Sequence, residues 1–152
     1  MKSKIYDCVT FFEENFITNL RFEILDEFID YFVICESQYD HRGNKKKLNF
    51  ELIDSKFKKK IIYLVHDKPF REEKNLWKNQ AEQREHIITG LDGAAPNDYI
   101  MFSDPDEIPR PELLKNLDLK KNMEYFCKIF IVTNLIFSIS MKVLGRELEC
   151  AK

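Results

Sequence analysis

The sequence predicts an α/β fold with a mainly parallel sheet flanked by helices. Short, continuously apolar runs recur along the chain, which is typical of strands covered on both faces. Segments with helical spacing of apolar residues separate the first run from the second and the third from the fourth. The chain has 152 residues, the size of one domain, so we expect these elements to share one core.

The first apolar run, residues 5–12, predicts the first strand. A helix is expected to follow Asn15, and Thr18 or Asn19 is available as its N-cap. Apolar residues at helical spacing predict the buried face of this helix: Ile17, Leu20, Ile24 and Phe28.

Residues 31–35 and 60–65 predict the next two strands, with a polar and basic stretch between them. A second helix is expected over about 77–91, followed by a Gly- and Pro-containing turn and a fourth strand at 99–102. The helical projection places Arg84 on an inward face with four apolar residues: Trp77, Ala81, Ile88 and Leu91. The expected order is βαββαβ, and such sheets bind ligands at the carboxyl ends of their strands.

Composition and charge exclude several classes of protein. With 44% hydrophobic and 33% charged residues, the chain can bury a core. The net charge of −2 gives no general attraction to nucleic acid, and we expect no nucleic-acid partner. The four cysteines form no Cys-x-x-Cys pair and are expected to be reduced thiols. The N-terminus lacks the apolar stretch of a secretory signal, which predicts a cytoplasmic location.

An acidic run, Asp104-Pro105-Asp106-Glu107, follows the fourth predicted strand. Clustered carboxylates repel one another, and a divalent cation would offset that repulsion. Oxygen ligands favour Mn²⁺ or Mg²⁺, which also accept oxygens from a diphosphate. Pro105 ends the strand and allows Asp104 and Asp106 to approach one ion. On residue types alone, an acidic turn that caps the next helix is an equal alternative.

Four segments in order along the chain resemble glycosyltransferase family 17: KIYDCVTFF, YFVICES, EQREHIITGL and MFSDPDEIPRP. The resemblance extends from Lys4 to Phe126. It implies a Rossmann-like fold of the GT-A type and a UDP-sugar donor whose diphosphate is held by Mn²⁺ or Mg²⁺ on Asp104 and Asp106. It also implies inverting transfer of a sugar, expected to be N-acetylglucosamine, to a glycan or other carbohydrate acceptor such as an N-glycan.

The resemblance suggests further donor-binding residues beside Asp104. Thr10 and Glu36 lie where GT-A proteins usually hold the nucleoside, and Gln83 and Arg84 match a Gln-Arg pair of the family. A structural interpretation stands beside two of them: a strand threonine such as Thr10 is more commonly satisfied by its neighbours than by a ligand, and Arg84 could pair with Glu36 or Asp67.

The sequence predicts a nucleotide-sugar-binding domain over residues 1–126 and an apolar C-terminal segment, 127–152, packing on it. That segment suits either a core strand and helix or an interfacial patch with peripheral membrane association. Family members usually continue further, so three interpretations of the chain stay open: a truncated form of the fold, a minimal enzyme, or a domain that only binds the donor. After Glu124 the only carboxylates are Glu147 and Glu149, and the sequence therefore assigns no catalytic base.

Three other functions remain open at this stage. One is an inactive domain that binds a UDP-sugar without transfer. Another is a phosphohydrolase or nucleotidyltransferase, which would need further metal ligands, and only Glu36 and Asp67 could supply them. The last is a non-catalytic interaction module, in which Asp104 and Asp106 would tolerate alanine.

Overall fold

A computed structural model of the chain describes residues 3–71, 75–115, 142–143 and 146–147. The chain divides into two compact units, Met1–Ile108 and Pro109–Lys152. The second unit contains α3 (Pro111–Leu114) and an antiparallel pair, β5 (Lys142–Val143) and β6 (Arg146–Glu147). The predicted domain boundary at residues 126 and 127 lies outside the described residues.

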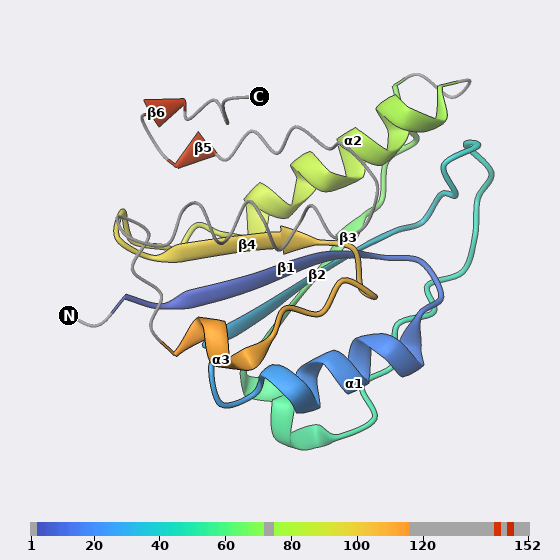
Figure 1. Ribbon diagram of the computed structural model, residues 1–152. Helices are drawn as coiled ribbons and strands as arrows, with labels where there is room; N and C mark the ends of the chain where they lie inside the picture. The colour runs from blue at the N-terminus through green and yellow to red at the C-terminus, as the bar shows by residue number, and fades with distance from the viewer. Residues whose placement is uncertain (1–2, 72–74, 116–141, 144–145, 148–152) are drawn as a thin grey trace. The chain divides into compact units, whose positions relative to one another are not determined.

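The first unit is built on a parallel sheet with the strand order β3-β2-β1-β4 (Figure 1). Its strands are β1 (Ile5–Phe11), β2 (Tyr31–Ser37), β3 (Ile61–His66) and β4 (Tyr99–Ser103). Every residue of β1 is buried, as a central strand covered on both faces requires. The predicted α/β class and the predicted order of elements are confirmed.

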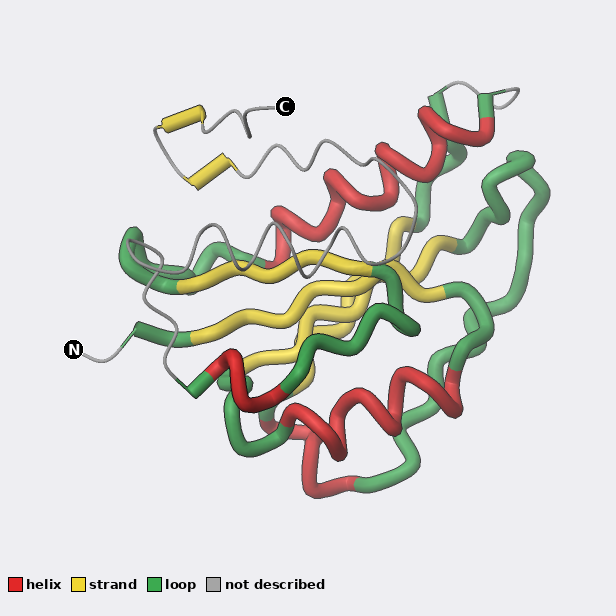
Figure 2. Tube along the Cα trace, in the orientation of Figure 1, coloured by secondary structure: helices red, strands yellow, loops and turns green. Residues whose placement is uncertain are grey.

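Two helices cover opposite faces of this sheet (Figure 1). They are α1 (Asn15–Leu25), between β1 and β2, and α2 (Leu76–His86), between β3 and β4. Short 3₁₀ turns, η1 (Ser55–Lys59) and η2 (Ile87–Gly90), precede β3 and follow α2. Figure 2 shows that the connection from β2 to β3 is mainly loop. None of the helices in the described part of the chain has the length and apolarity needed to cross a bilayer.

The core has one cluster on each face of the sheet. On the α2 face, buried residues pack together as one cluster: Tyr6, Cys8, Val33, Cys35 and Ile87. On the α1 face, the ring of Phe22 packs 4.7 Å from Phe32 and 5.7 Å from Phe57, measured between centroids. Alternation of side chains along each strand produces these two clusters.

The buried face of α1 differs from the prediction. Leu20 and Ile24 are each 38% exposed, while the buried residues are Thr18, Asn19, Arg21, Phe22 and Leu25. Apolar residues occur around most of the helix, so periodicity alone did not fix its rotation. A salt bridge from Arg21 to Asp7 of β1 and the ring contacts of Phe22 turn this side toward the sheet.

The predicted N-cap of α1 was also wrong. The cap is Glu14, whose side chain forms no capping hydrogen bond. Asn19 instead bonds the next connection: its Nδ2 donates to the carbonyl of Glu51 at 2.9 Å, and its Oδ1 accepts from the amide of Ile53 at 2.9 Å. Its Nδ2 also donates to the carbonyl of Asn15 at 2.8 Å, so Asn19 joins α1 to this connection and does not cap the helix.

The inward face predicted for the second helix was wrong as well. Trp77 is 70% exposed and Ile88 is 67% exposed, whereas the buried residues of α2 are Asn79 and Gln83. The helix ends at His86 and continues as the 3₁₀ turn η2, which rotates Ile87 into the core. Polar inward residues explain the error: Asn79 donates to the carbonyl of His41 in a loop, and Gln83 donates to carbonyls of β1 and β2, partners that the sequence does not reveal.

The cysteines that the structure describes are free thiols buried in β1 and β2. Burial raises the pKa of the Cys35 thiol to about 12 and raises the pKa of Cys8 further. Both thiols are therefore protonated near neutral pH and behave as small core residues. The predictions for Cys127 and Cys150 fall outside the described residues.

Candidate functional site

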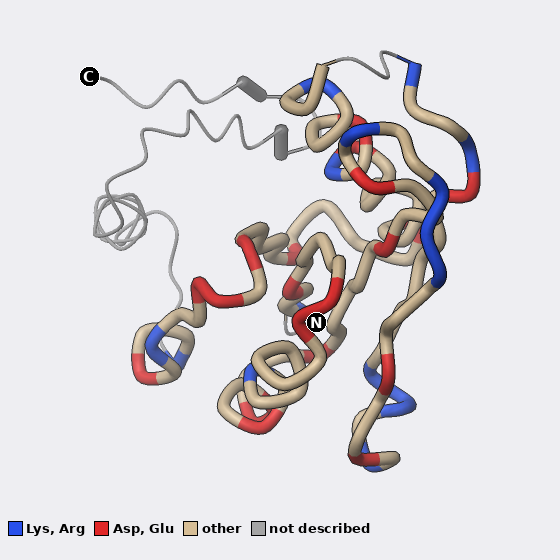
Figure 3. The backbone as a smooth tube through the Cα atoms, turned by 90° about the vertical axis from the view of Figure 1, so that its right-hand side faces the viewer, with Lys and Arg blue, Asp and Glu red and all other residues tan. Residues whose placement is uncertain are grey.

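The polar residues of interest gather at the carboxyl edge of the sheet, where the four parallel strands end. Figure 3 looks onto this edge, which is at the right in Figure 1. A run of three lysines, Lys45-Lys46-Lys47, lies in the connection that leaves β2 at this edge. The acidic turn leaves the end of β4 at the same edge. Charges of opposite sign therefore border one edge.

The acidic turn has a defined backbone. The amide of Glu107 donates to the carbonyl of Asp104 at 3.0 Å, and Glu107 Oε2 accepts from the amide of Asp104 at 3.2 Å. Pro105 is buried, whereas Asp106 is exposed and the Asp104 side chain is 39% exposed. Glu107 thus stabilises the turn, and the two aspartates present carboxylates to solvent.

Arg84 of α2 forms a salt bridge with the first of these aspartates. Its Nη2 lies 3.0 Å from Asp104 Oδ1, and its guanidinium lies over the ring of Phe102, 5.3 Å from the centroid. The side chains are 23% and 39% exposed, respectively. The structure therefore brings two predicted donor-site residues together, and Arg84 pairs with Asp104 instead of Glu36 or Asp67.

A second arginine holds the same turn from the other face of the sheet. Arg21 of α1, 1% exposed, forms a two-pronged ion pair with Asp7, with both N···O distances 2.7 Å. The same guanidinium donates to Ser103 Oγ at 2.7 Å and to the carbonyl oxygens of Asp104 and Glu107 at 3.1 and 3.0 Å. The turn is thus bonded to both helical layers.

Glu36 at the end of β2 lies on the α1 face and is fully buried. Its Oε1 accepts from Lys46 Nζ at 2.6 Å and from the amide of Asn49 at 2.7 Å. Its Oε2 accepts from the amide of Phe50 at 3.1 Å and from the hydroxyl of Tyr63 at 2.7 Å. Four donors occupy this carboxylate, so it anchors the β2–β3 connection, and Arg84 lies on the opposite face.

Gln83 is buried beneath the edge and joins three segments. Its Nε2 donates to the carbonyls of Phe11 at 3.3 Å and Cys35 at 2.9 Å, the ends of β1 and β2. Its Oε1 lies 2.8 Å from Nε2 of His41. Thr10, 9% exposed, belongs to the same end of β1. Gln83 therefore fixes the position of α2 and of the loop that carries His41.

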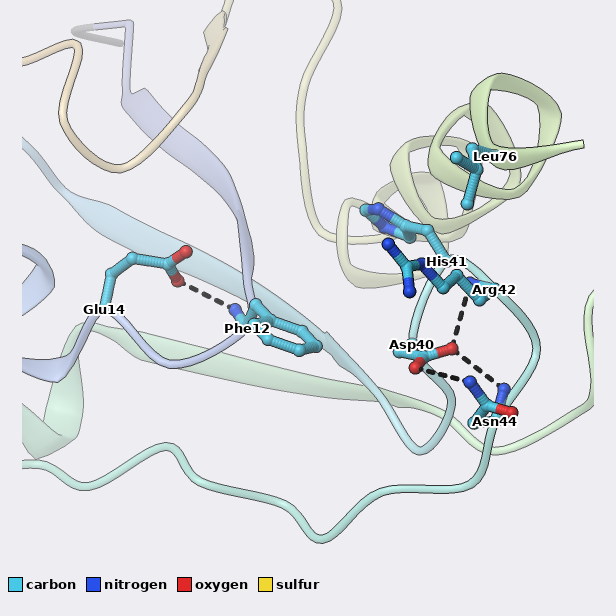
Figure 4. A pocket seen from close by; sticks show the side chains of 7 residues that line it. All are labelled: Phe12, Glu14, Asp40, His41, Arg42, Asn44 and Leu76. Carbon is cyan, nitrogen blue, oxygen red and sulfur yellow. Dashed lines mark hydrogen bonds between the residues drawn. The ribbon is translucent and has the colours of Figure 1, made fainter.

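A cavity of about 520 Å³ opens beside these strand ends (Figure 4). Its lining comes from the end of β1, the loop after β2 and the start of α2: Phe12, Glu14, Asp40, His41, Arg42, Asn44 and Leu76. Asp40 shapes the loop, because its Oδ1 accepts from the amides of Arg42 at 2.9 Å and Asn44 at 2.8 Å. Gly43 has φ 86°, which favours glycine at this turn. The volume suits a nucleoside-sized ligand.

His66 closes the end of β3 and is buried. Its ring stacks on Phe70 and its Nε2 lies 3.6 Å from Glu82 Oε1. Burial, then the nearby His86, lowers the pKa of His66 from 6.5. Its Nδ1 has no hydrogen-bond partner within the described residues. The neutral form of His66 is therefore favoured in the folded protein.

A divalent cation at the acidic turn would find few protein ligands. Within the residues that the structure describes, no group of three or more His, Cys, Asp or Glu side chains is arranged to hold a metal ion. Asp104 and Asp106 offer two carboxylates, and Mg²⁺-like ions commonly bind one or two carboxylates together with water and substrate phosphates. An ion held here would therefore need further oxygen ligands from water or a substrate.

A parallel sheet with helices on both faces and polar groups at its carboxyl edge defines a Rossmann-like α/β protein. Residues 1–143 match the family model described as Glycosyltransferase family 17. The chain belongs to this family, and it is a glycosyltransferase that works with a sugar donor and a carbohydrate acceptor. No curated protein and no solved structure matches the chain.

Sequence reasoning missed Arg21 and Asp7 as residues that support the site. A signal was present for Asp7, a charged residue in the otherwise largely apolar run of β1, whereas Arg21 lies in a helix of mixed polar and apolar residues and gave no such signal. A charged residue at a buried position needs a partner of opposite charge. The sequence therefore indicated that Asp7 needs a cationic partner, but it identified neither Arg21 nor the contact with the turn.

Proposed function

We propose that the chain binds a UDP-sugar together with Mn²⁺ or Mg²⁺ and transfers the sugar, N-acetylglucosamine, to a glycan with inversion. The observation that carries this proposal is the exposed pair of carboxylates, Asp104 and Asp106, at the carboxyl end of β4 with Arg84 beside them. Membership of glycosyltransferase family 17 supports it. We further propose a GT-A fold, a cytoplasmic location and an N-glycan-like acceptor.

In this proposal Asp104 and Asp106 are the metal ligands. The chemistry expected of the bound cation is stabilisation of the negative charge that develops on the departing diphosphate. Arg84 supplies a second positive charge at the same place. A cation on Asp104 would compete with the 3.0 Å salt bridge, and Arg84 would then turn toward a phosphate oxygen when the donor binds.

The nucleoside is proposed to occupy the cavity at the ends of β1 and β2. Phe12 is 40% exposed there and offers a ring face for a base. Thr10 and Gln83 support the wall of this site from β1 and α2. Glu36 contributes indirectly, because it anchors the β2–β3 connection, whose first part lines the cavity.

The test is calorimetric titration with UDP and UDP-N-acetylglucosamine, each with and without Mn²⁺. Wild type is compared with Asp106→Ala and with the control Asp92→Ala, an exposed aspartate in the turn before β4. The expected result is metal-dependent binding that is lost in Asp106→Ala and kept in Asp92→Ala. Binding by wild type that is independent of metal, or no binding at all, would contradict the proposal.

A transfer assay then separates an active enzyme from a binding domain. UDP release from UDP-N-acetylglucosamine is measured in the presence of a glycan acceptor, with a no-acceptor control. Acceptor-dependent release is expected. Binding without such release would assign the chain to donor binding alone.

A further inference from the structure

We propose that Arg21 is a positioning residue for the acidic turn: its buried guanidinium holds the turn's backbone so that Asp104 and Asp106 present their carboxylates together. This inference rests on the proposed metal site, and it concerns a residue that would not touch donor or metal. The contacts of Arg21 carry it.

Arg21 reaches the turn through its backbone oxygens. Its Nη1 donates to the carbonyls of Asp104 at 3.1 Å, Pro105 at 3.4 Å and Glu107 at 3.0 Å. Three carbonyl oxygens of one short segment therefore converge on a single nitrogen. With its carbonyls directed inward, the segment is fixed while Asp106 stays exposed and Asp104 stays partly exposed.

The rest of the guanidinium is fixed by the sheet. Nε and Nη2 each lie 2.7 Å from an oxygen of Asp7, and Nη2 also lies 2.7 Å from Ser103 Oγ. Asp7 belongs to β1 and Ser103 to β4, and these strands are paired in the sheet. The planar fork of arginine allows these contacts at once, and lysine, with a single ammonium, cannot reproduce them.

Stability alone is a weak reason for this arrangement. Replacing a buried ion pair by apolar residues of similar volume is often neutral or stabilising, because burying two charges is costly. An apolar pair at these positions could close the core, but it could not bond the carbonyls of the turn. The charged pair therefore serves the geometry of the turn.

Arg21 and Arg84 act on different parts of the same aspartate. Arg21 bonds the carbonyl oxygen of Asp104 from α1, and Arg84 bonds its carboxylate from α2. A cation can replace Arg84 at the carboxylate without disturbing the backbone. Arg21 keeps the turn in place in both states.

The experiment compares wild type with Arg21→Lys and Ser103→Ala by two measurements. Electron paramagnetic resonance of free Mn²⁺ gives metal affinity, and hydrogen exchange followed by mass spectrometry gives the protection of residues 103–108. For Arg21→Lys we expect Mn²⁺ affinity to fall roughly tenfold or more, the size typical of residues that orient metal ligands, and exchange to rise in the turn. Ser103→Ala removes a hydroxyl that accepts from Arg21 Nη2 at 2.7 Å and donates to the carbonyl of Glu107 at 3.4 Å, and it is expected to lower the affinity about twofold to threefold.

Two controls separate positioning from general destabilisation. Arg71→Lys changes an arginine whose side chain is 85% exposed, and it should match wild type. Val33→Ala weakens the core in β2, away from the turn, and should lower the melting temperature while keeping Mn²⁺ affinity and turn protection.

Each outcome decides the inference. The inference would be overturned if both Arg21→Lys and Ser103→Ala kept the Mn²⁺ affinity and the turn protection of wild type. It would also be overturned if Val33→Ala lost as much Mn²⁺ affinity as Arg21→Lys. If Arg21→Lys does not fold, Ser103→Ala decides. If wild type binds no Mn²⁺, the proposed metal site fails, and turn protection alone then decides whether Arg21 positions this segment.

Discussion

Replacing Glu36 by glutamine tests how the β2–β3 connection is held at the site. The carboxylate is fully buried and accepts hydrogen bonds from four donors. Glutamine keeps the shape but turns one acceptor oxygen into an NH₂ donor. The better orientation keeps oxygen toward Lys46 and Asn49 and places the NH₂ group toward Phe50 and Tyr63.

The loss of stability follows from the bonds that change. The amide of Phe50 would face another donor, and an unsatisfied buried group costs about 1–3 kcal/mol. The Lys46 bond would lose its anionic acceptor, which lowers its contribution by about 1 kcal/mol. The hydroxyl of Tyr63 can rotate to accept from the new NH₂ group. We therefore expect Glu36→Gln to lower the free energy of unfolding by about 2–4 kcal/mol.

Urea denaturation followed by circular dichroism measures this difference. The matched control is Tyr63→Phe, which removes one donor and should cost about 1 kcal/mol. A loss below about 1 kcal/mol for Glu36→Gln would refute the view that the ionised carboxylate anchors the connection. If Glu36 only anchors this loop, folded Glu36→Gln should also retain most of the UDP affinity of wild type.

Three further predictions concern other parts of the first unit. Arg84→Gln should raise the affinity for Mn²⁺ alone, because it removes a cation that competes for Asp104. The same variant should lower the affinity for UDP in the presence of Mn²⁺. A rise of both affinities, or a fall of both, would contradict this prediction. The lowered pKa of His66, caused first by burial, means that stability is fully present above pH 6.5 and declines as the pH falls below 6.5 toward the folded-state pKa. His66→Phe should therefore flatten the dependence of melting temperature on pH between 7 and 5. An unchanged slope would mean that other groups cause this pH dependence. Gly90→Ala should destabilise the protein by about 1–3 kcal/mol in urea denaturation, since its new methyl would lie 2.8 Å from a leucine side chain of β3, whereas Gly93→Ala meets no atom within 4 Å and should be near neutral.

Patterns local in the chain predicted most of the secondary structure. The apolar runs located all four strands of the parallel sheet within one or two residues. The central strands β1 and β2 are buried on both faces and need apolar residues, whereas the edge strands β3 and β4 are only partly buried. The rotation of the helices was not predictable in this way. Arg21 in α1 and Gln83 in α2 face inward because of partners that lie far away in the sequence: Asp7 and the turn for Arg21, and the carbonyls of Phe11 and Cys35 for Gln83.

The sequence by itself determined the class of fold, the family and the acidic turn at the end of β4, since each depends on short local segments and on their order along the chain. Only the tertiary structure decided the partners of that turn. It pairs Arg84 with Asp104, bonds the Glu36 carboxylate to the β2–β3 connection and places Arg21 beneath the turn. Buried polar groups must find partners wherever the fold brings donors and acceptors together, and that meeting depends on packing between distant segments.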